Sequence, residues 1–255
     1  MNTPQIDVHA VADCFDAFRA SKPRVHCITN SVAQHFTANV LLAAGAVPSM
    51  TVAMAEIASF VESADALLIN LGTLDPERRQ AIELAVETSN AHDVPWGLDP
   101  VFVQASPTRL ALASRLLLQR PAFVRCNRGE GEVLFEEMAF AERLQDIAKR
   151  FDTTLVVSGQ TDLATSGEEQ VSVANGHALM DRVTAMGCAL TALMTGFVAV
   201  ERNRLLATVS AVLVFGLAGE RAAKQANGPG SFSTAILDAL YNLDRETIIA
   251  EGRLS

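Results

Sequence analysis

A glycine and a cysteine, Gly187 and Cys188, stand together where a turn of small residues runs into a long apolar helical stretch over residues 189–200. The first backbone N–H groups of a helix have no partner within the helix, so this turn predicts an anion site. The helix dipole is expected to lower the pKa of the Cys188 thiol, which predicts a base or a nucleophile. On this feature alone, a small buried cysteine at a helix start is an equally good interpretation.

Three polar side chains and an arginine could serve a metal and a phosphate. Asp99 ends a predicted strand, and Asn127 and Glu130 lie one helical turn apart, so both can face one point. Amide and carboxylate oxygens with room for water suit Mg²⁺ held together with substrate phosphates. Spacing alone favours a helix-capping role for Asn127 and Glu130. Arg125 could bind phosphate through two hydrogen bonds, although a structural salt bridge is the commoner role of arginine.

Common phosphate-binding and hydrolase motifs are missing from the sequence. It contains no G-x-x-x-x-G-K-[ST], no G-x-S-x-G, and no G-x-G-x-x-G after the first predicted strand. A nucleotide would need another cradle, and the turn over residues 185–188 is the best candidate. The four cysteines lie far apart without a C-x-x-C pair, which predicts neither a zinc site nor a disulfide framework.

Short β-rich runs alternate with helical patterns along most of the chain, which predicts a three-layer α/β/α fold with a mainly parallel central sheet. We expect residues 1–255 to form a single domain. Residues 162–165 and 170–173 predict an antiparallel hairpin. The other predicted strands cover residues 24–29, 46–51, 66–71, 95–99, 122–126 and 153–159. The predicted helices cover residues 32–44, 53–62, 76–92, 107–119, 130–150 (with a break expected near Met138), 187–200, 204–226 and 231–242.

Polar residues follow the apolar runs at six places. In parallel sheets, ligands bind beyond the carboxyl ends of the strands, so these residues are candidates for the site. Each alone could be a helix cap or a turn former, but six such groups on one sheet edge favour a binding site. They are Thr29, Asn30, Asn70, Gly72, Thr73, Asp99, Pro100, Asn127, Ser158 and Gly159.

Composition limits the class of protein. The 255 residues are 49% hydrophobic and carry a net charge of −9, without the basic face that nucleic-acid binding needs. The N-terminal residues do not resemble a signal peptide, and polar residues interrupt the apolar helices, which predicts a cytoplasmic protein without membrane contact. Abundant apolar residues suggest burial between subunits.

Eight short motifs resemble, in order and spacing, those of the hydroxyethylthiazole kinase family of the ribokinase-like superfamily. The resemblance covers residues 22–242. It implies ATP-dependent phosphorylation of the primary alcohol of 4-methyl-5-(2-hydroxyethyl)thiazole, a thiamine salvage step, by a homotrimer with sites at its subunit interfaces. The motifs are VHCITN (25–30) with FTAN (36–39), GAVPSM (45–50), LINLGT (68–73), WGLDPV (96–101), N-x-x-E (127–130), VVSG (156–159), GCAL (187–190) and GPGSF (228–232).

The resemblance also implies roles for individual residues. It assigns the thiazole pocket to Asn30, Met50 and Ala185, ATP contacts to Arg125, Ser158 and Gly187, magnesium chemistry to Asp99 and Glu130, and the substrate hydroxyl to Cys188. Ser158 stands where the family commonly has threonine. The family's usual Gly-Thr-Gly-Cys is Ala-Met-Gly-Cys at 185–188, which replaces a glycine suited to positive φ and reshapes the thiazole side.

Two other functions are compatible with these residues. One is a kinase for another small heteroaromatic alcohol such as hydroxymethylpyrimidine, against which Cys188 and the set Thr29, Asn30 and Met50 argue. The other is a catalytically weak or silent paralogue that binds thiazole or nucleotide, which the change at 185–186 suggests.

Overall fold

Eight strands form one sheet in the computed structural model, which describes residues 6–136 and 140–255. Their order across the sheet is β2-β1-β3-β4-β5-β6-β7-β8; β1 to β6 run parallel, and β7 and β8 are antiparallel at one edge. The predicted sheet and hairpin are thus confirmed. The strands are β1 (Arg24–Ile28), β2 (Val47–Ser49), β3 (Ala66–Asn70), β4 (Trp96–Asp99), β5 (Phe123–Asn127), β6 (Thr154–Ser158), β7 (Asp162–Thr165) and β8 (Gln170–Val173).

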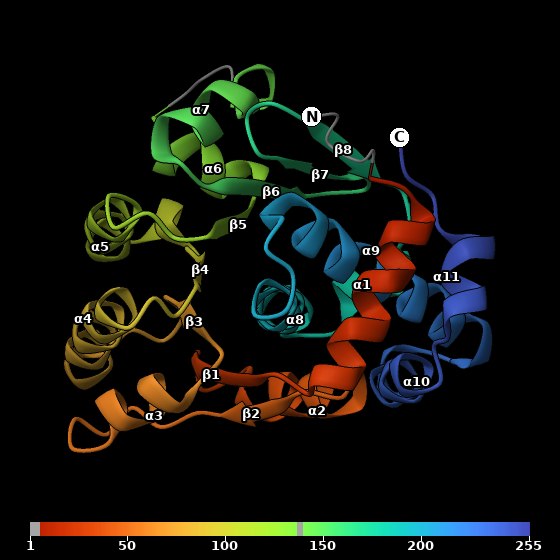
Figure 1. Cartoon of the computed structure of the whole chain (residues 1–255), viewed down its shortest axis with the longest axis horizontal. Helices are drawn as coiled ribbons and strands as arrows, with labels where there is room; N and C mark the ends of the chain where they lie inside the picture. The colour runs from red at the N-terminus through yellow and green to blue at the C-terminus, as the bar shows by residue number, and fades with distance from the viewer. Residues whose placement is uncertain (1–5, 137–139) are drawn as a thin grey trace.

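Helices cover both faces of the sheet, which confirms the predicted three layers (Figure 1). On one face lie α3 (Ile57–Ser63), α4 (Pro76–Ala91), α5 (Pro107–Leu117), α6 (Arg128–Leu134) and α7 (Leu144–Phe151). On the other lie α1 (Val8–Ser21), α2 (Gln34–Ala44), α8 (Met186–Val198), α9 (Arg204–Gln225), α10 (Pro229–Tyr241) and α11 (Arg245–Glu251). Three short 3₁₀ helices cover Val103–Ala105, Phe140–Glu142 and Ala178–Arg182.

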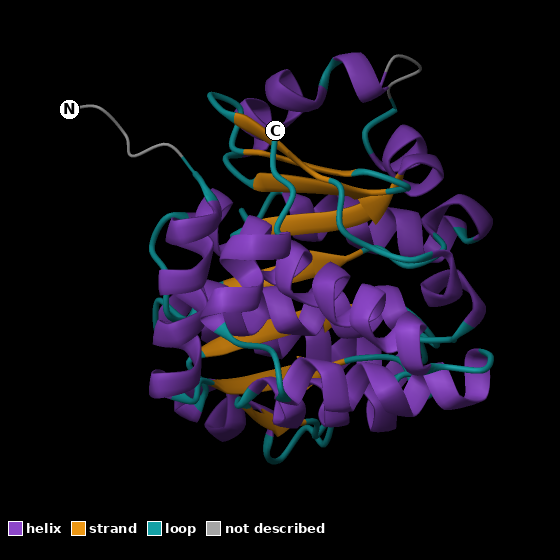
Figure 2. Cartoon of the chain, turned by 90° about the vertical axis from the view of Figure 1, so that its right-hand side faces the viewer, coloured by secondary structure: helices purple, strands orange, loops and turns teal. Residues whose placement is uncertain are grey.

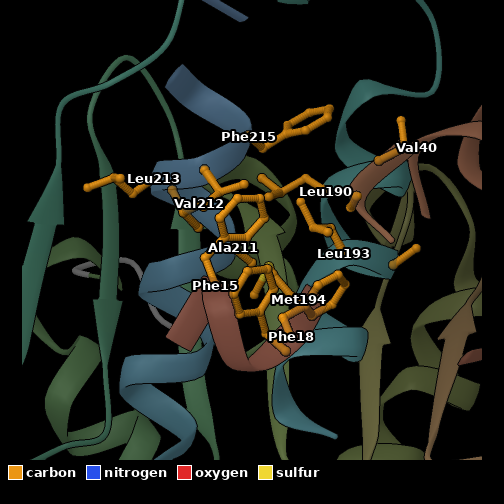
Figure 3. Close-up of a cluster of buried hydrophobic side chains, with 14 of the residues drawn as sticks. Phe15, Phe18, Val40, Leu190, Leu193, Met194, Ala211, Val212, Leu213 and Phe215 are labelled. Atoms are coloured by element: carbon orange, nitrogen blue, oxygen red, sulfur yellow. The ribbon is translucent and has the colours of Figure 1, made fainter. Parts of the chain in front are cut away.

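Two hydrophobic clusters hold the layers together, one on each face of the sheet. In the larger cluster, aromatic and aliphatic side chains from α1, α8 and α9 pack together (Figure 3). The rings of Phe18 and Phe197 stack with their centroids 4.5 Å apart. Each large side chain buried in this way contributes about 1.5–3 kcal/mol of transfer free energy. This packing fixes α8, whose first turn faces the carboxyl ends of the strands.

The longest helix, α9, is apolar along most of its length. By length and composition it could cross a membrane, but 83% of its apolar window is buried inside the protein. It packs against α8, α10 and α1. The apolar residues of α9 are therefore part of the larger hydrophobic cluster.

Two helices were not predicted from the sequence. The first, α1, has the signals of a helix: the Asp7 side chain accepts a hydrogen bond from the N–H of Ala10, and Phe15 and Phe18 lie on its buried face. The last, α11, begins after a similar cap at Asp244. The predicted helix over residues 130–150 is two helices, α6 and α7; Met138, where a break was expected, lies outside the described residues.

The chain ends beside the antiparallel edge of the sheet (Figure 2). There Leu254 forms an antiparallel bridge with Val173, the last residue of β8. The C-terminal residues thus extend the sheet by one short pairing.

Candidate active site

Polar side chains gather at the carboxyl edge of the parallel strands, as the sequence predicts. Strand register pairs Asn70 with Asp99 and Asn127 with Ser158. Asn30 lies two residues beyond β1. These five residues therefore come from five strands that lie next to one another in the sheet.

A chain of buried hydrogen bonds links four of the polar side chains. Asn30 Nδ2 donates to Asn70 Oδ1 at 3.1 Å, and Asn70 Nδ2 donates to Asp99 Oδ2 at 3.0 Å. Thr191 Oγ1, from α8, lies 2.8 Å from the same carboxylate oxygen. Because Thr191 is in α8, the chain ties the sheet edge to the helix that carries Cys188.

The Asp99 carboxyl group at the centre of this chain is fully buried. Burial raises its pKa to about 6, although Arg125 acts in the opposite direction; Glu130 raises it further. Within the described residues, Asp99 Oδ1 is buried without a hydrogen-bond partner. An unsatisfied carboxylate oxygen is costly, so this atom is suited to a ligand that approaches from the site.

Cys188 stands in the first turn of α8, where the sequence placed it. Asn30 Nδ2 is 3.2 Å from its sulfur, so the predicted substrate residue and the predicted catalytic residue touch. The prediction of a lowered thiol pKa is wrong. Burial, followed by the charge of Asp99, raises the pKa of Cys188 to about 11, and these effects outweigh the hydrogen bonds of Asn70 and Asn30 and the charge of Arg125.

Arg125, in β5, lies against the turn that precedes α8 and the start of that helix. Ala185 is the N-cap and adopts the left-handed conformation, with φ 71° and ψ 1°, the backbone for which glycine is better suited. A Cβ atom on Gly187 would lie 2.6 Å from Arg125 Nη1, so the guanidinium occupies the space that a side chain would fill. Arg125 Nε also donates to Ser158 Oγ at 2.8 Å. Arg125, Ser158 and Gly187, the three predicted ATP residues, thus form one cluster.

Glu130 and Asn127 form the capping box that their spacing suggests. Asn127 N–H donates to Glu130 Oε2 at 3.0 Å, and Glu130 N–H donates to Asn127 Oδ1 at 2.9 Å. The N–H of Phe102, which has φ 57°, donates to Glu130 Oε1 at 2.9 Å. Glu130 therefore fixes the loop after β4 to the start of α6.

A cavity of about 900 Å³ opens beside this edge. Arg125, Asn127, Ser158 and Gly187 line one side of it. Residues between β8 and α8, together with residues of α9, line the other; they include Asn175, Gly176, His177, Asp181, Phe215 and Gly216. The residues of this second wall were not predicted from the sequence, and the polar residues after β8 were their one local signal.

The residues that line this cavity do not include Asn30, Asp99, Glu130, Ala185 or Cys188, and they do not include Met50. Met50 follows β2, which pairs with β1, so Met50 and Asn30 follow neighbouring strands. His26, buried in β1, positions the segment around Met50: Nε2–H donates to the Thr51 carbonyl at 3.1 Å, and Nδ1 accepts from the Ser49 hydroxyl at 2.8 Å.

The described residues contain no group of three or more His, Cys, Asp or Glu side chains arranged to hold a metal ion. A Mg²⁺ ion needs only one or two carboxylates when substrate phosphates and water complete its shell. The free Oδ1 of Asp99 suits such a role. Each Glu130 oxygen already accepts a backbone hydrogen bond but keeps further lone pairs.

The chain has a ribokinase-like fold. A ribokinase-like superfamily protein from Enterococcus faecalis superposes with a TM-score of 0.71 over 96% of this chain and 99% of its own, at 15% identity. That likeness concerns the fold.

Closer similarities identify the family. A hydroxyethylthiazole kinase protein from Pyrococcus horikoshii has a TM-score of 0.92 and 36% identity over 96% of this chain and 98% of its own. A probable hydroxyethylthiazole kinase from Agrobacterium fabrum is 42% identical over 95% of this chain and 94% of its own. The model of the hydroxyethylthiazole kinase family matches residues 15–246. The chain belongs to the hydroxyethylthiazole kinase family.

Proposed function

We propose that this protein transfers the γ-phosphoryl group of ATP to the primary hydroxyl of 4-methyl-5-(2-hydroxyethyl)thiazole, a salvage step of thiamine biosynthesis. The observation that carries the proposal is the position of α8. Its first turn touches Asn30 through Cys188 on one side and Arg125 through Gly187 on the other. One helix start thus joins the residues expected to hold the acceptor alcohol to those expected to hold ATP.

The cavity of about 900 Å³ is the proposed nucleotide site. Arg125, anchored by Ser158, neutralises phosphate charge at its inner end. The N–H groups at the start of α8, next to Gly187, provide further donors for the transferring group. Such positioned charges are the main requirement of phosphoryl transfer, because the reaction needs little covalent help from the protein.

The acceptor alcohol is proposed to lie on the other side of α8, against Asn30, Met50 and Ala185. Cys188 orients the hydroxyl group, and only its thiolate form can receive the hydroxyl proton late in the transfer. With a thiol pKa of about 11, Cys188 is weakly ionised at neutral pH. Catalysis therefore depends more on orientation than on a preformed base, and we expect modest turnover.

We propose that Mg²⁺ binds with the phosphates of ATP near Asp99 and Glu130. When bound, the metal neutralises phosphate charge. Asp99 would offer its free Oδ1 to the metal, and Glu130 would offer its remaining lone pairs while it keeps the loop after β4 in place. This division follows from the different hydrogen bonding of the two carboxylates.

We further propose a cytoplasmic homotrimer of single-domain subunits, with thiazole sites between subunits. Apolar side chains near the edge strand β2 support a subunit contact there: Val47 is 50% exposed, Met54 43% and Phe60 37%. Such a cluster around an edge strand is costly to leave in water. Sedimentation of the pure protein measures the oligomeric state.

A coupled assay of ADP formation with ATP, Mg²⁺ and hydroxyethylthiazole tests the proposed reaction. We expect turnover that requires all three components. ADP formation with a hydroxymethylpyrimidine alone would instead favour the related kinase function. Nucleotide binding without turnover on either alcohol would favour a silent paralogue.

A further inference from the structure

The last residues of the chain hold one wall of the large cavity. Ser172 and Ser255 exchange two backbone hydrogen bonds, with N···O distances of 2.7 and 3.1 Å, and Ala174 N–H donates to the Arg253 carbonyl at 3.1 Å. These bonds extend β8 up to the point where residues 174–182 leave the sheet for α8. Asn175 and Gly176, in that segment, line the cavity.

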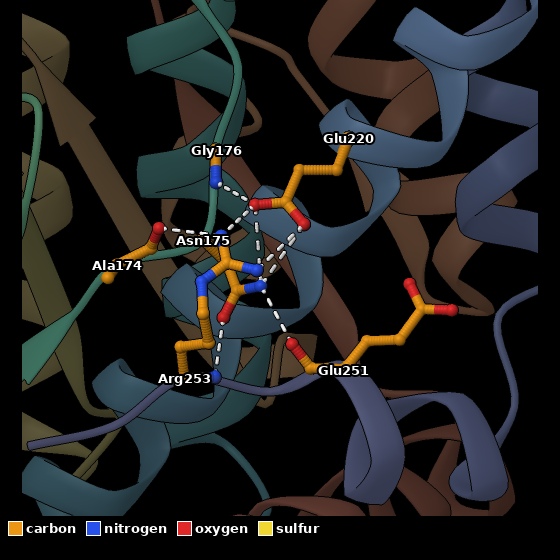
Figure 4. Close-up of polar contacts among 6 residues, drawn as sticks. All are labelled: Ala174, Asn175, Gly176, Glu220, Glu251 and Arg253. Carbon is orange, nitrogen blue, oxygen red and sulfur yellow. Dashed lines mark hydrogen bonds and ion pairs between the residues drawn. The ribbon is translucent and has the colours of Figure 1, made fainter.

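Glu220 of α9 connects the same segment to the C-terminal residues (Figure 4). Its Oε1 accepts from Gly176 N–H at 2.8 Å and from Arg253 Nη2. Arg253 Nη1 donates to Oε2 at 3.3 Å, and Nη2 also donates to the Ala174 carbonyl at 2.8 Å. The ion pair is therefore bonded to the backbone of the wall at two residues, Ala174 and Gly176.

Asn175 completes this arrangement with a buried side chain. Its Oδ1 accepts from the N–H of Arg253 at 2.7 Å, and its Nδ2 donates to the Glu251 carbonyl at 3.1 Å. Both groups of the amide are thus used by the C-terminal segment. The side chain faces that segment, while its backbone belongs to the cavity wall.

The wall has no space to move toward α9. A Cβ atom on Gly216 would lie 2.5 Å from the Asn175 carbonyl oxygen, closer than real contacts allow. Gly216 and Asn175 both line the cavity. Hydrogen bonds with Glu220 and Arg253 therefore hold the wall on one side, and Gly216 packs against the Asn175 carbonyl on the other.

We propose that Glu220 and Arg253 are positioning residues that set the shape of the nucleotide site by fixing residues 174–176. They act through the backbone of Ala174 and Gly176 and do not touch the nucleotide. The inference rests on the proposed function in that it takes the cavity as the ATP site. Their expected effect is on nucleotide affinity, whereas the thiazole side, built on β1, β2 and α8, is unaffected.

The test compares Arg253→Ala with wild type by calorimetric titration with a non-hydrolysable ATP analogue and Mg²⁺. We expect Kd to rise about tenfold, KM for ATP to rise with it, and KM for thiazole to stay within twofold. Arg253→Lys, which can keep one charged contact, is expected to recover part of the affinity. Gly216→Ala leaves the ion pair in place but displaces Asn175, so it is expected to weaken nucleotide binding as well.

Arg221→Ala is the matched control, because Arg221 binds Thr247 and Glu251 of the same C-terminal helix but not residues 174–176. It should leave the nucleotide Kd unchanged. A lower melting temperature with an unchanged Kd in Arg253→Ala and Gly216→Ala would overturn the inference, as would an equal loss of affinity in the control. Since the titration needs no acceptor, wild type that binds nucleotide without phosphorylating thiazole would refute the proposed reaction and leave this comparison valid.

Discussion

The guanidinium group of Arg125 lies against the backbone of Gly187, in the first turn of α8. A Cβ atom at position 187 would be 2.6 Å from Nη1 and 2.9 Å from Nη2. Arg125 reaches this position because Ser158, on the neighbouring strand, accepts a hydrogen bond from its Nε. The absence of a side chain at Gly187 is therefore what lets a strand arginine stand at a helix start.

Substitution Gly187→Ala is expected to displace the guanidinium while the protein stays folded, since the end of an arginine side chain can move. We expect kcat/KM for ATP to fall about 10- to 100-fold, because small misplacements of positioning groups are costly in phosphoryl transfer. Steady-state kinetics measures this. Gly230→Ala, where a Cβ meets nothing within 4 Å, is the control and should be near wild type.

Cys188 is expected to react slowly with iodoacetamide at pH 8. A thiol with a pKa of about 11 has about a hundredfold less thiolate there than one at the ordinary value of 9.0. Labelling followed by mass spectrometry should show the rate rising up to about pH 11, and Cys188→Ala should remove it. Rapid labelling of Cys188 at pH 7 would contradict the assigned burial.

The substitution Glu130→Gln separates the two roles of this residue. A glutamine amide would face one of the two backbone N–H donors, so we expect a loss of about 1–3 kcal/mol in the free energy of unfolding. If Glu130 also serves magnesium chemistry, turnover and its magnesium dependence should fall as well. A destabilised variant with wild-type rate and magnesium dependence would leave Glu130 with its capping role alone.

His26 is expected to make the protein sensitive to acid. Burial lowers the pKa of His26 to about 4, although its bond to the Thr51 carbonyl acts the other way. Between pH 6.5 and 4 the unfolded state binds more protons than the folded state. The contribution of the His26 pKa shift to the free energy of unfolding is therefore complete above pH 6.5 and is lost as the pH drops. The loss is on the order of 3 kcal/mol. The free energy of unfolding, measured by denaturant titration at several pH values, should depend less on pH for His26→Gln than for wild type. His35→Gln, at an exposed site, should match wild type.

The substitution Ala185→Gly is expected to stabilise the protein slightly. Left-handed backbone costs alanine roughly 1–2 kcal/mol, and the greater freedom of glycine in the unfolded chain returns about 0.4–1 kcal/mol of this. Thermal unfolding should therefore show a small rise in Tm. The same change at Ala189, inside α8, should lower Tm, because glycine is unfavourable within a helix. A decrease in both variants would mean that Ala185 carries no strain.

Local patterns were sufficient to predict the layers of the fold and the edge of the site. Alternating strand and helix signals determine a parallel sheet, and such a sheet brings the residues after its strands to one edge. Asn30, Asp99 and Asn127 could be nominated for this reason. The capping box of Asn127 and Glu130 was readable too, because its two partners lie within one turn.

Tertiary structure decided the rest, because burial and distant contacts have no local pattern. The thiol pKa of Cys188 rises because the folded protein buries the thiol and because Asp99, distant in sequence, lies nearby. The closeness of Arg125 and Gly187 depends on how α8 packs on the sheet. The second wall of the cavity depends on the C-terminal residues, because Asn175 of this wall hydrogen-bonds to Arg253, which lies 78 positions further along the chain. The sequence by itself determined which groups are present at the sheet edge, and packing determined their charge state and which of them touch.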